Sequence, residues 1–196
     1  RHLGLDSEKK LERKGVTYCA TCDGALPMFR DQPLVVVGGG DSACEEANYL
    51  TRFGSIVYLV HRRDSLRASR IMAERTLANP KIEVLWNTEI REILGTQQEG
   101  VTAVRIYNNQ TAEESLYPTK GVFVAIGHKP NTELFEGVLD MDETGYLIAD
   151  GVKTKIAGVY TAGDVSDSVY RQAVTAAGTG CAAALEAERF LEAIGE

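Results

Sequence analysis

The sequence predicts an α/β fold, and three of its patterns lead to this prediction. Residues 34–37 and 55–60 form short, mostly β-branched apolar runs, which are typical of strands buried on both faces of a parallel sheet. A glycine-rich turn and a segment with helical spacing, residues 41–53, separate the two runs. Residues 89–94 and 101–107 instead alternate between apolar and polar side chains, which predicts an antiparallel meander or hairpin.

The same patterns predict further elements and a division into two parts. We expect helices over 68–78 and 170–194, because both segments carry apolar residues at helical spacing. The composition changes after Gly127 towards Pro, Asn and acidic residues, so the predicted division is residues 1–128 and 129–196. The remaining predicted strands are 82–85, 122–126 and 158–162, the last running into a Gly-Asp turn.

The charge balance excludes some kinds of partner. The 196 residues include 21 Lys and Arg against 28 Asp and Glu, for a net charge of −7. An acidic chain repels a phosphate backbone on average, which argues against nucleic acid. No stretch of about 18 apolar residues and no signal peptide are present, so we expect no membrane span and a cytoplasmic protein. The basic residues gather around His61, Arg62, Arg63 and Arg67, which suggests a small anionic ligand.

Residues 38–43 match the pattern G-x-G-x-x-A of a dinucleotide-binding turn. In this pattern the first glycine permits the tight turn, the second lets the backbone approach a pyrophosphate, and the small final residue, here Ala43, lets helix and strand pack closely. The following helix offers free N–H groups and a positive dipole end to an anion. The match follows a predicted strand and opens a predicted helix. We therefore favour a Rossmann-like three-layer nucleotide-binding domain over a plain strand-to-helix turn.

The end of the second predicted strand indicates which nucleotide binds. NAD sites usually carry an acid there that bonds the ribose 2′-OH. This chain has His61-Arg62-Arg63-Asp64 instead, with Arg67 one turn later. Arginine guanidinium groups pair well with a phosphate, so these residues predict NADP(H). The alternative is a solvated basic loop in which Asp64 pairs internally.

Cys19 and Cys22 form a C-x-x-C pair that is close enough to form and break a disulfide with little backbone movement. Asp23 follows directly, where a carboxyl group can shuttle a proton to a departing thiolate. The alternative is half of a zinc site. Zinc needs four ligands, and Cys44 and Cys181 lie far apart without a neighbouring His or Cys, so we expect no metal. We expect both of these cysteines to be buried small residues of apolar helices.

Six motifs together are more specific than any one of them. They are Cys-Ala-Thr-Cys-Asp-Gly at 19–24, Gly-Gly-Gly-Asp-Ser-Ala-Cys-Glu-Glu-Ala at 38–47, His-Arg-Arg-Asp at 61–64, Ala-Ile-Gly-His-Lys-Pro-Asn at 125–131, Thr-Ala-Gly-Asp-Val at 161–165 and Tyr-Arg-Gln-Ala at 170–173. In this combination and order they resemble the low-molecular-weight thioredoxin reductases of bacteria, fungi and plants. The resemblance covers essentially the whole chain.

The resemblance implies an enzyme with two Rossmann-like domains, one for FAD and one for NADPH, that works as a homodimer. Electrons would pass from NADPH through FAD to the C-x-x-C disulfide and on to thioredoxin. The resemblance makes Cys19 and Cys22 the redox pair and Asp23 the acid–base residue. It assigns NADP(H) binding to Gly38, Gly39, Gly40, Asp41, Ser42, Ala43, Glu46, His61, Arg62, Arg63, Arg67, Ile126, Gly127 and His128, and FAD binding to Gly163, Asp164, Arg171, Gln172 and Ala173.

One departure from the family pattern matters. No strand–glycine–helix unit precedes Cys19, where the family has the turn that holds the FAD pyrophosphate. The chain also starts at Arg1, so we expect an N-terminal truncation, with 129–196 as the C-terminal remnant of an incomplete FAD domain. We expect the chain alone to bind FAD poorly and to be inactive. The alternatives are a related flavin-dependent disulfide reductase with a peroxidase or glutaredoxin-like partner, a catalytically inactive NADP(H)-binding fragment, and a zinc-stabilised binding module.

Overall fold

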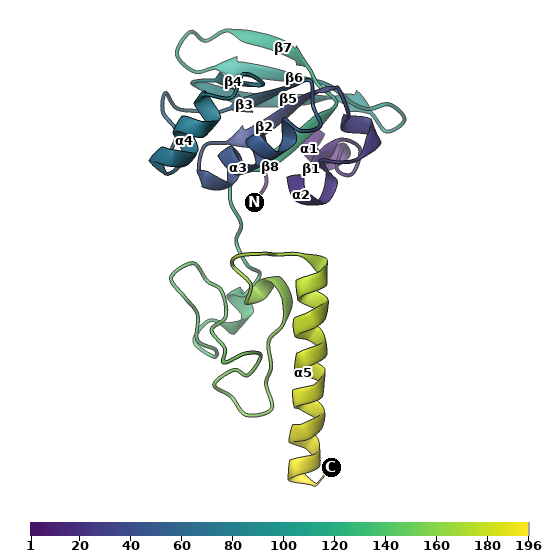
Figure 1. Cartoon of the computed structure of the whole chain (residues 1–196), viewed down its shortest axis with the longest axis vertical. Coiled ribbons are helices and arrows are strands. Elements are labelled where there is room, and N and C mark those ends of the chain that lie inside the picture. Colours follow the sequence, from purple (N-terminus) through teal and green to yellow (C-terminus); the bar gives the residue numbers. More distant parts are fainter. Residues whose placement is uncertain (196) are drawn as a thin grey trace. The chain divides into compact units, whose positions relative to one another are not determined.

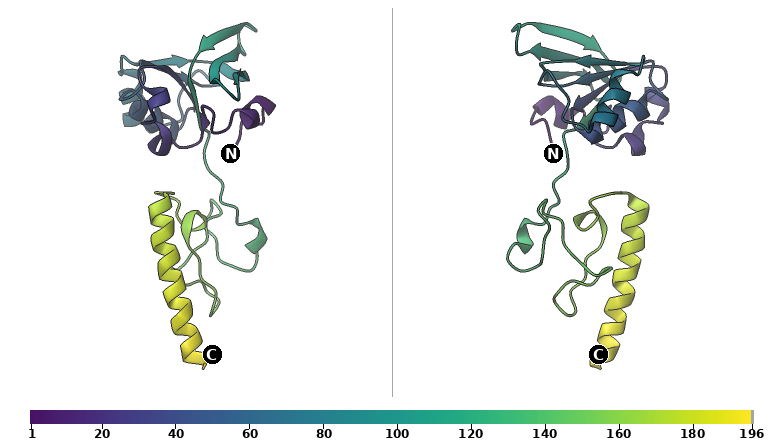
Figure 2. Two further views of the ribbon diagram at one scale, coloured as in Figure 1. Left: turned by 90° about the vertical axis from the view of Figure 1, so that its right-hand side faces the viewer. Right: turned by 60° about the vertical axis from the view of Figure 1, so that its left-hand side comes forward.

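A computed structural model gives the structure of residues 1–195. The chain divides into two compact units, Arg1–Gly127 and a second unit that begins at His128. Figure 1 shows two sheets in the first unit and one long helix beside irregular loops in the second, and Figure 2 gives two further views of each. The two units are described separately below.

The first unit is built on a five-stranded sheet with the order β1-β8-β2-β3-β4, in which every neighbouring pair is parallel. Helix α3 connects β2 with β3, and α4 lies between β3 and β4 in the chain. The bounds are α1 Asp6–Lys10, β1 Val16–Thr17, α2 Ala20–Asp23, η1 Pro27–Phe29, β2 Pro33–Gly38, α3 Asp41–Leu50, β3 Ile56–Val60, α4 Arg70–Leu77, β4 Ile82–Leu85 and β8 Gly121–Ala125.

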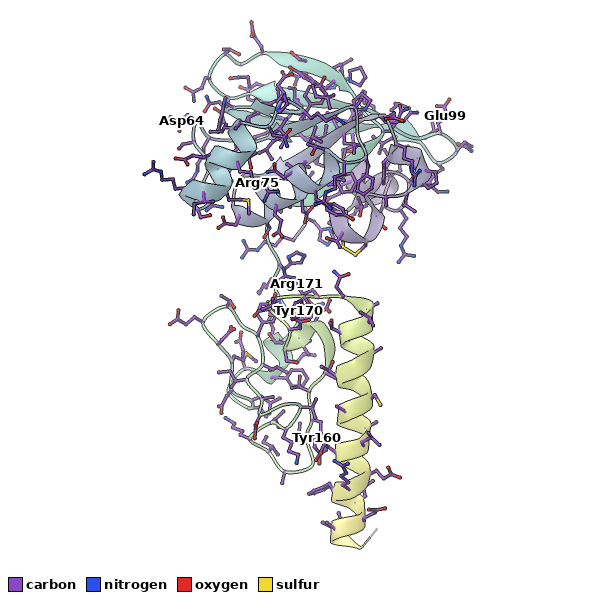
Figure 3. The ribbon with its side chains drawn as sticks, in the orientation of Figure 1. Asp64, Arg75, Glu99, Tyr160, Tyr170 and Arg171 are labelled. Carbon is purple, nitrogen blue, oxygen red and sulfur yellow. A yellow bond between two sulfur atoms is a disulfide. The ribbon has the colours of Figure 1, made fainter. Side chains whose placement is uncertain are left out.

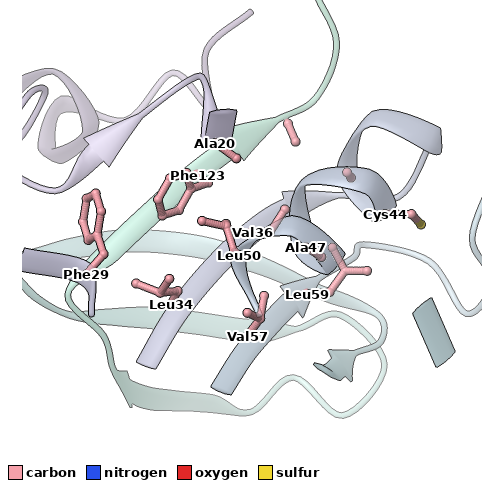
Figure 4. Close-up of a cluster of buried hydrophobic side chains, with 12 residues drawn as sticks. Ala20, Phe29, Leu34, Val36, Cys44, Ala47, Leu50, Val57, Leu59 and Phe123 are labelled. Atoms are coloured by element: carbon pink, nitrogen blue, oxygen red, sulfur yellow. The ribbon is translucent and has the colours of Figure 1, made fainter. Parts of the chain in front are cut away.

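Strand β2 shows why a continuous apolar run is needed in the middle of this sheet. Leu34 and Val36 point to one face, where they pack in a cluster with Ala47 and Leu50 of α3. Figure 4 shows this cluster. Val35 points to the opposite face and packs in a second cluster with residues of the other sheet. Because successive side chains of a strand alternate between faces, a strand covered on both sides has no position for a polar residue.

The second sheet covers the face of the parallel sheet that the helices leave open. Its order is β5-β6-β7, with both pairs antiparallel, and its bounds are β5 Thr88–Thr96, β6 Gly100–Asn108 and β7 Glu114–Pro118. Ile93 of β5 and Val104 of β6 join Val35 and Val122 in the second cluster. Figure 1 shows the resulting order of layers: helices, parallel sheet and antiparallel sheet. This arrangement confirms the predicted Rossmann-like three-layer α/β fold with an antiparallel meander.

Strand β7 was not predicted from the sequence. Four of its five residues are exposed, and Leu116, the apolar residue at its centre, is 55% exposed. Edge strands that bury little show no strong hydrophobic pattern. The charged residue Glu114 at its start and Pro118 at its end also lower its strand propensity.

The second unit has little regular structure before its long helix α5, Ala173–Ile194. Its short elements are η2 Glu133–Phe135 and η3 Gly163–Val165. The strand predicted over 158–162 is wrong, because Tyr160 forms only an isolated bridge with Lys153 instead of a continuous ladder. The helix predicted over 170–194 begins three residues later, since Gln172 is its N-cap, and Gly178 and Gly180 do not interrupt it.

No residue of α5 is buried in the part of the chain that the structure describes. The loops of the second unit contact the helix through polar and apolar groups: the Tyr160 hydroxyl donates to the Glu186 carbonyl at 3.0 Å, and Gly158 lies against the Phe190 ring. The prediction that Cys181 is buried is therefore wrong, whereas Cys44 on α3 is fully buried as predicted. Among the described helices, none is long and apolar enough to cross a membrane.

Substituting Leu50 by Ala tests the packing of α3 on the parallel sheet. Leu50 is fully buried, so we expect the Leu50→Ala variant to lose about 2–5 kcal/mol of unfolding free energy. The loss arises because fewer apolar atoms are removed from water on folding and because a cavity remains in the core. Leu77→Ala is the matched control, because Leu77 is 56% exposed and its removal should change stability by less than about 0.5 kcal/mol. Urea unfolding followed by circular dichroism measures both. Equal midpoints for the two variants would contradict the packing described here.

Candidate functional site

Cys19 and Cys22 form a disulfide at the start of α2, with their Cα atoms 5.3 Å apart. The yellow bond in Figure 3 marks it at the surface of the first unit. Cys19 lies directly before the helix, and its sulfur also accepts a hydrogen bond from the Cys22 N–H at 3.1 Å. Cys22 is exposed and Cys19 is half-buried. A disulfide placed in this way is accessible to an attacking thiolate.

The Asp23 carboxylate is held by a residue that sequence reasoning missed. The Thr17 hydroxyl, on β1, donates a hydrogen bond to Asp23 Oδ2. The same Thr17 oxygen accepts from the Cys19 N–H at 3.3 Å. Thr17 is buried, so it connects the first cysteine with the carboxylate inside the unit. A single threonine two positions before a cysteine carries no recognisable sequence signal.

A second polar cluster, also missed, lies beside the disulfide. The carboxylate of Glu8 is fully buried and accepts hydrogen bonds from the N–H groups of Leu3 (3.0 Å) and Gly4 (2.9 Å) and from the Tyr18 hydroxyl (3.2 Å). Burial, followed by the charge of Glu8, raises the pKa of Tyr18. His2 Nδ1 lies 3.0 Å from the Tyr18 oxygen. Since Tyr18 precedes Cys19 in the chain, this cluster anchors the first residues of the unit to the disulfide segment.

The glycine turn after β2 is shaped by close contacts that exclude side chains. A Cβ on Gly38 would lie 2.6 Å from the Cβ of Ala43, and one on Gly39 would lie 2.2 Å from the His61 ring. Gly38 also has φ +156°, at the edge of the left-handed region. Among residues 1–195, no side chain caps the N-terminus of α3. The N–H groups of its first turn are therefore available to an anion.

The segment between β3 and α4 carries the predicted phosphate-binding residues, and we call residues 61–67 the arginine loop. His61 is buried, and its Nε2 lies 2.9 Å from the Ser65 carbonyl oxygen. The Arg67 N–H donates to the Gly39 carbonyl at 2.6 Å. The tertiary structure thus brings the arginine loop and the glycine turn together, although about 20 residues separate them in the pattern.

The three arginines of this loop are exposed, and within residues 1–195 no ion pair is formed by Arg62, Arg63 or Arg67. Asp64, labelled in Figure 3, accepts a hydrogen bond from the Ser65 hydroxyl at 3.2 Å and does not neutralise them. Guanidinium groups that form no ion pair within the described residues keep their N–H donors for an anion such as a phosphate.

Asp41 has a structural role beside the glycine turn. Its Oδ1 accepts hydrogen bonds from the Ser69 hydroxyl at 2.7 Å and the Ser69 N–H at 2.9 Å. These two bonds lower the pKa of the Asp41 carboxyl. They connect the start of α3 to the residue before α4. Of the other predicted residues of α3, Ser42 is exposed in its first turn and Glu46 is half-buried.

The predicted residues beyond β8 begin beside the glycine turn, because Ala125 at the end of β8 pairs with Gly38 in the parallel ladder. Ile126 packs against the second core cluster, and Gly127 ends the first unit with φ +92°. Burial, and then the nearby charge of Arg171, lower the pKa of His128.

The FAD-binding residues expected at the start of α5 are held by local hydrogen bonds. Arg171 adopts φ +49°, and its N–H donates to Asp167 at 2.9 Å, while Gln172 caps α5 immediately before Ala173. Gly163 donates its N–H to Thr179 of α5 at 3.0 Å, and Asp164 is exposed in the next position. The described residues contain no group of three or more His, Cys, Asp or Glu arranged to hold a metal ion.

A disulfide and a dinucleotide-type glycine turn on one Rossmann-like unit are the features of enzymes that couple a nucleotide to thiol chemistry. Residues 1–180 match the family model described as "Pyridine nucleotide-disulphide oxidoreductase". The chain therefore belongs to this family. Membership implies the use of a pyridine nucleotide.

The individual relatives agree with this assignment. The chain is 52% identical over 185 residues to thioredoxin reductase 2 of Arabidopsis thaliana. This match spans 93% of the chain and 48% of the relative. It is 57% identical over 181 residues to the thioredoxin reductase of Chlamydia pneumoniae, and this match spans 91% of the chain and 58% of that relative. Thioredoxin reductase from Streptococcus pyogenes MGAS5005 matches in structure with a TM-score of 0.92 and 42% identity, covering 98% of this chain and 62% of that one. The chain thus spans about half to three fifths of the length of these relatives.

Substituting Gly39 by Ala tests the contact between the glycine turn and the arginine loop. The new Cβ would overlap the His61 ring, which has no room to move away because it is buried, so we expect a loss of about 1–3 kcal/mol of unfolding free energy. Gly40→Ala is the control, since no atom lies within 4 Å of a Cβ at Gly40 and its backbone is extended. Thermal unfolding of the two variants compares them, and a Gly39→Ala variant as stable as Gly40→Ala would refute the close contact.

Proposed function

We propose that this chain is the NADP(H)-binding and disulfide-carrying part of a thioredoxin reductase, together with a C-terminal part of its FAD domain. In this proposal residues 1–128 bind NADP(H) and carry the redox pair, and residues 129–196 contribute to FAD binding. The single observation that carries it is the accessible Cys19–Cys22 disulfide on the same unit as the unpaired arginine loop. The names of the relatives support thioredoxin as the partner.

The residues around the glycine turn fit a dinucleotide with a 2′-phosphate. The start of α3 would hold the pyrophosphate, because no side chain among the described residues caps it and no atom lies within 4 Å of a Cβ placed at its N-cap, Gly40. Arg62, Arg63 and Arg67 would hold the 2′-phosphate, since their side chains have no other ion-pair partner among residues 1–195.

The flavin part of the proposal concerns the turn before α5. Asp164 is an exposed carboxylate that would bond to polar groups of FAD, and Arg171, Gln172 and Ala173 would lie against its ring system. When both are bound, NADPH and FAD supply the two electrons that open the disulfide.

The chain's own residues then carry out the thiol chemistry. In the reduced pair, one thiolate sulfur attacks the partner's disulfide, which breaks that S–S bond and forms a mixed disulfide. The other cysteine attacks the mixed disulfide, so that the Cys19–Cys22 bond forms again and the partner leaves as a dithiol. Asp23, held by Thr17, would give and take the proton that the departing sulfur needs. We also propose that the complete protein is a cytoplasmic homodimer.

Replacing either cysteine tests the redox assignment. In the full-length natural protein, Cys19→Ser or Cys22→Ser should reduce NADPH-dependent thioredoxin reduction by at least about a thousandfold, because neither variant can form the disulfide. Cys44→Ala is the control, since Cys44 is buried on α3 away from the disulfide pair and should keep most of the activity. Unchanged thioredoxin reduction by the Cys19 variant would end the proposal. Wild-type enzyme that reduces only a peroxidase or glutaredoxin-like partner would point to the related reductase class.

Nucleotide binding to the 196-residue chain tests the NADP(H) assignment without flavin. We expect 2′,5′-ADP to bind more tightly than 5′-AMP, because only the former carries the 2′-phosphate. Arg63→Ala should weaken 2′,5′-ADP binding by about tenfold or more, the value of a charge-assisted contact, and leave 5′-AMP binding unchanged. Arg75→Ala is the control, because this exposed arginine lies near the end of α4, outside the arginine loop. Isothermal titration calorimetry measures all of these affinities, and equal binding of the two nucleotides would contradict the assignment.

A further inference from the structure

The turn between β6 and β7 contacts the arginine loop, although it belongs to the other sheet. The Asn109 side-chain amide donates a hydrogen bond from Nδ2 to the Arg62 carbonyl oxygen at 3.0 Å, across 47 positions of the chain. The Asn109 N–H donates to the Asn87 carbonyl at 2.7 Å, and the Asn87 N–H donates to the Arg63 carbonyl at 3.0 Å. The backbone of two successive arginines is thus held by a pair of asparagines.

The turn that carries Asn109 is ordered without help from the loop. Asn108 Oδ1 accepts the N–H groups of Gln110 (2.9 Å) and Thr111 (3.1 Å), and the Ala112 N–H donates to the Asn108 carbonyl at 2.9 Å. Asn108 and the neighbouring β6–β7 pairs therefore fix the position from which Asn109 reaches the loop. A fixed donor can define the backbone of a loop that is itself exposed.

The other end of the arginine loop is held by different contacts. The His61 ring packs against Gly39, and the Arg67 N–H bonds to the Gly39 carbonyl. These contacts shape the approach to the pyrophosphate. Loss of the Asn109 side chain would leave them intact, together with the backbone bond from Asn87 to Arg63, and would release only the Arg62 carbonyl. A change at Asn109 should therefore affect recognition of the 2′-phosphate and not binding of the rest of the nucleotide.

We propose that Asn109 is a positioning residue that determines the preference for a 2′-phosphorylated nucleotide, acting through the backbone of Arg62. The inference rests on the proposed use of NADP(H) and adds a residue from the second sheet to that site. Holding the Arg62 backbone in place removes conformational freedom before binding, so less is lost when its guanidinium group closes on the phosphate. The three arginines alone would attract the phosphate, and the hydrogen bond from Asn109 fixes the backbone of one of them, Arg62.

The experiment compares NADP⁺ and NAD⁺ binding to the 196-residue chain and its variants by isothermal titration calorimetry. Asn109→Ala should weaken NADP⁺ binding about three- to tenfold, the usual effect of one hydrogen bond, and change NAD⁺ binding by less than about twofold. Asn109→Asp should weaken NADP⁺ binding at least as much, because it lacks the amide donor and adds a negative charge. Thr111→Ala is the matched control in the same turn, since within the described part of the chain its hydroxyl bonds to Glu113 and not to the arginine loop.

Trp86 gives an independent readout, because it is the chain's one tryptophan and its ring centroid lies 6.2 Å from that of His61. We expect its fluorescence change on adding NADP⁺ to require about three- to tenfold more ligand in Asn109→Ala than in Thr111→Ala. Equal NADP⁺ affinities in these two variants, or an equal loss for both nucleotides in Asn109→Ala, would overturn the inference. Wild-type chain that binds NADP⁺ no better than NAD⁺ would instead overturn the proposed nucleotide, which is a separate result.

Discussion

The His61 ring lies against the backbone of Gly39, and the candidate nucleotide site depends on this contact. It joins the end of β2 to the end of β3, and the hydrogen bond from Arg67 to the Gly39 carbonyl closes the same junction. Any side chain at position 39 would occupy the space of the ring. The absence of a side chain at Gly39 therefore admits the residue that orders the arginine loop.

The parallel sheet places all the candidate groups of the first unit at one edge. β1, β8, β2 and β3 are neighbours in this order, and all run in the same direction. The disulfide follows β1, the glycine turn follows β2, and the arginine loop follows β3. Because the carboxyl ends of parallel strands meet at one edge, the disulfide and the candidate nucleotide-binding residues lie at the same edge of one sheet.

The two units differ in how far their residues are buried. In the first, two clusters fill both faces of the parallel sheet, and even the ionisable Glu8 is enclosed with its hydrogen-bond donors around it. In the second, the 22 residues of α5 include none that is buried in the described chain, although the helix is rich in alanine. An apolar helix gains most of its stability from packing, so α5 has apolar surface that its own unit leaves uncovered.

The sequence alone determined the features that are local in the chain. The β-branched runs, the G-x-G-x-x-A turn and the C-x-x-C pair lie within short windows, and their physical meaning does not depend on distant residues. It also predicted the three layers, because continuous and alternating apolar patterns distinguish a buried sheet from a half-exposed one. It did not predict β7, since an exposed edge strand buries too little to show a pattern, and it wrongly expected a strand at 158–162 and burial of Cys181.

Only the tertiary structure decided which distant residues support these motifs. Thr17 holds Asp23, Glu8 anchors Tyr18 beside the disulfide, and Asn109 reaches Arg62 from another sheet. None of these polar residues is unusual in its local sequence. Each acquires its role from the packing of strands, which brings a donor within about 3 Å of an acceptor that lies far away along the chain or on another element.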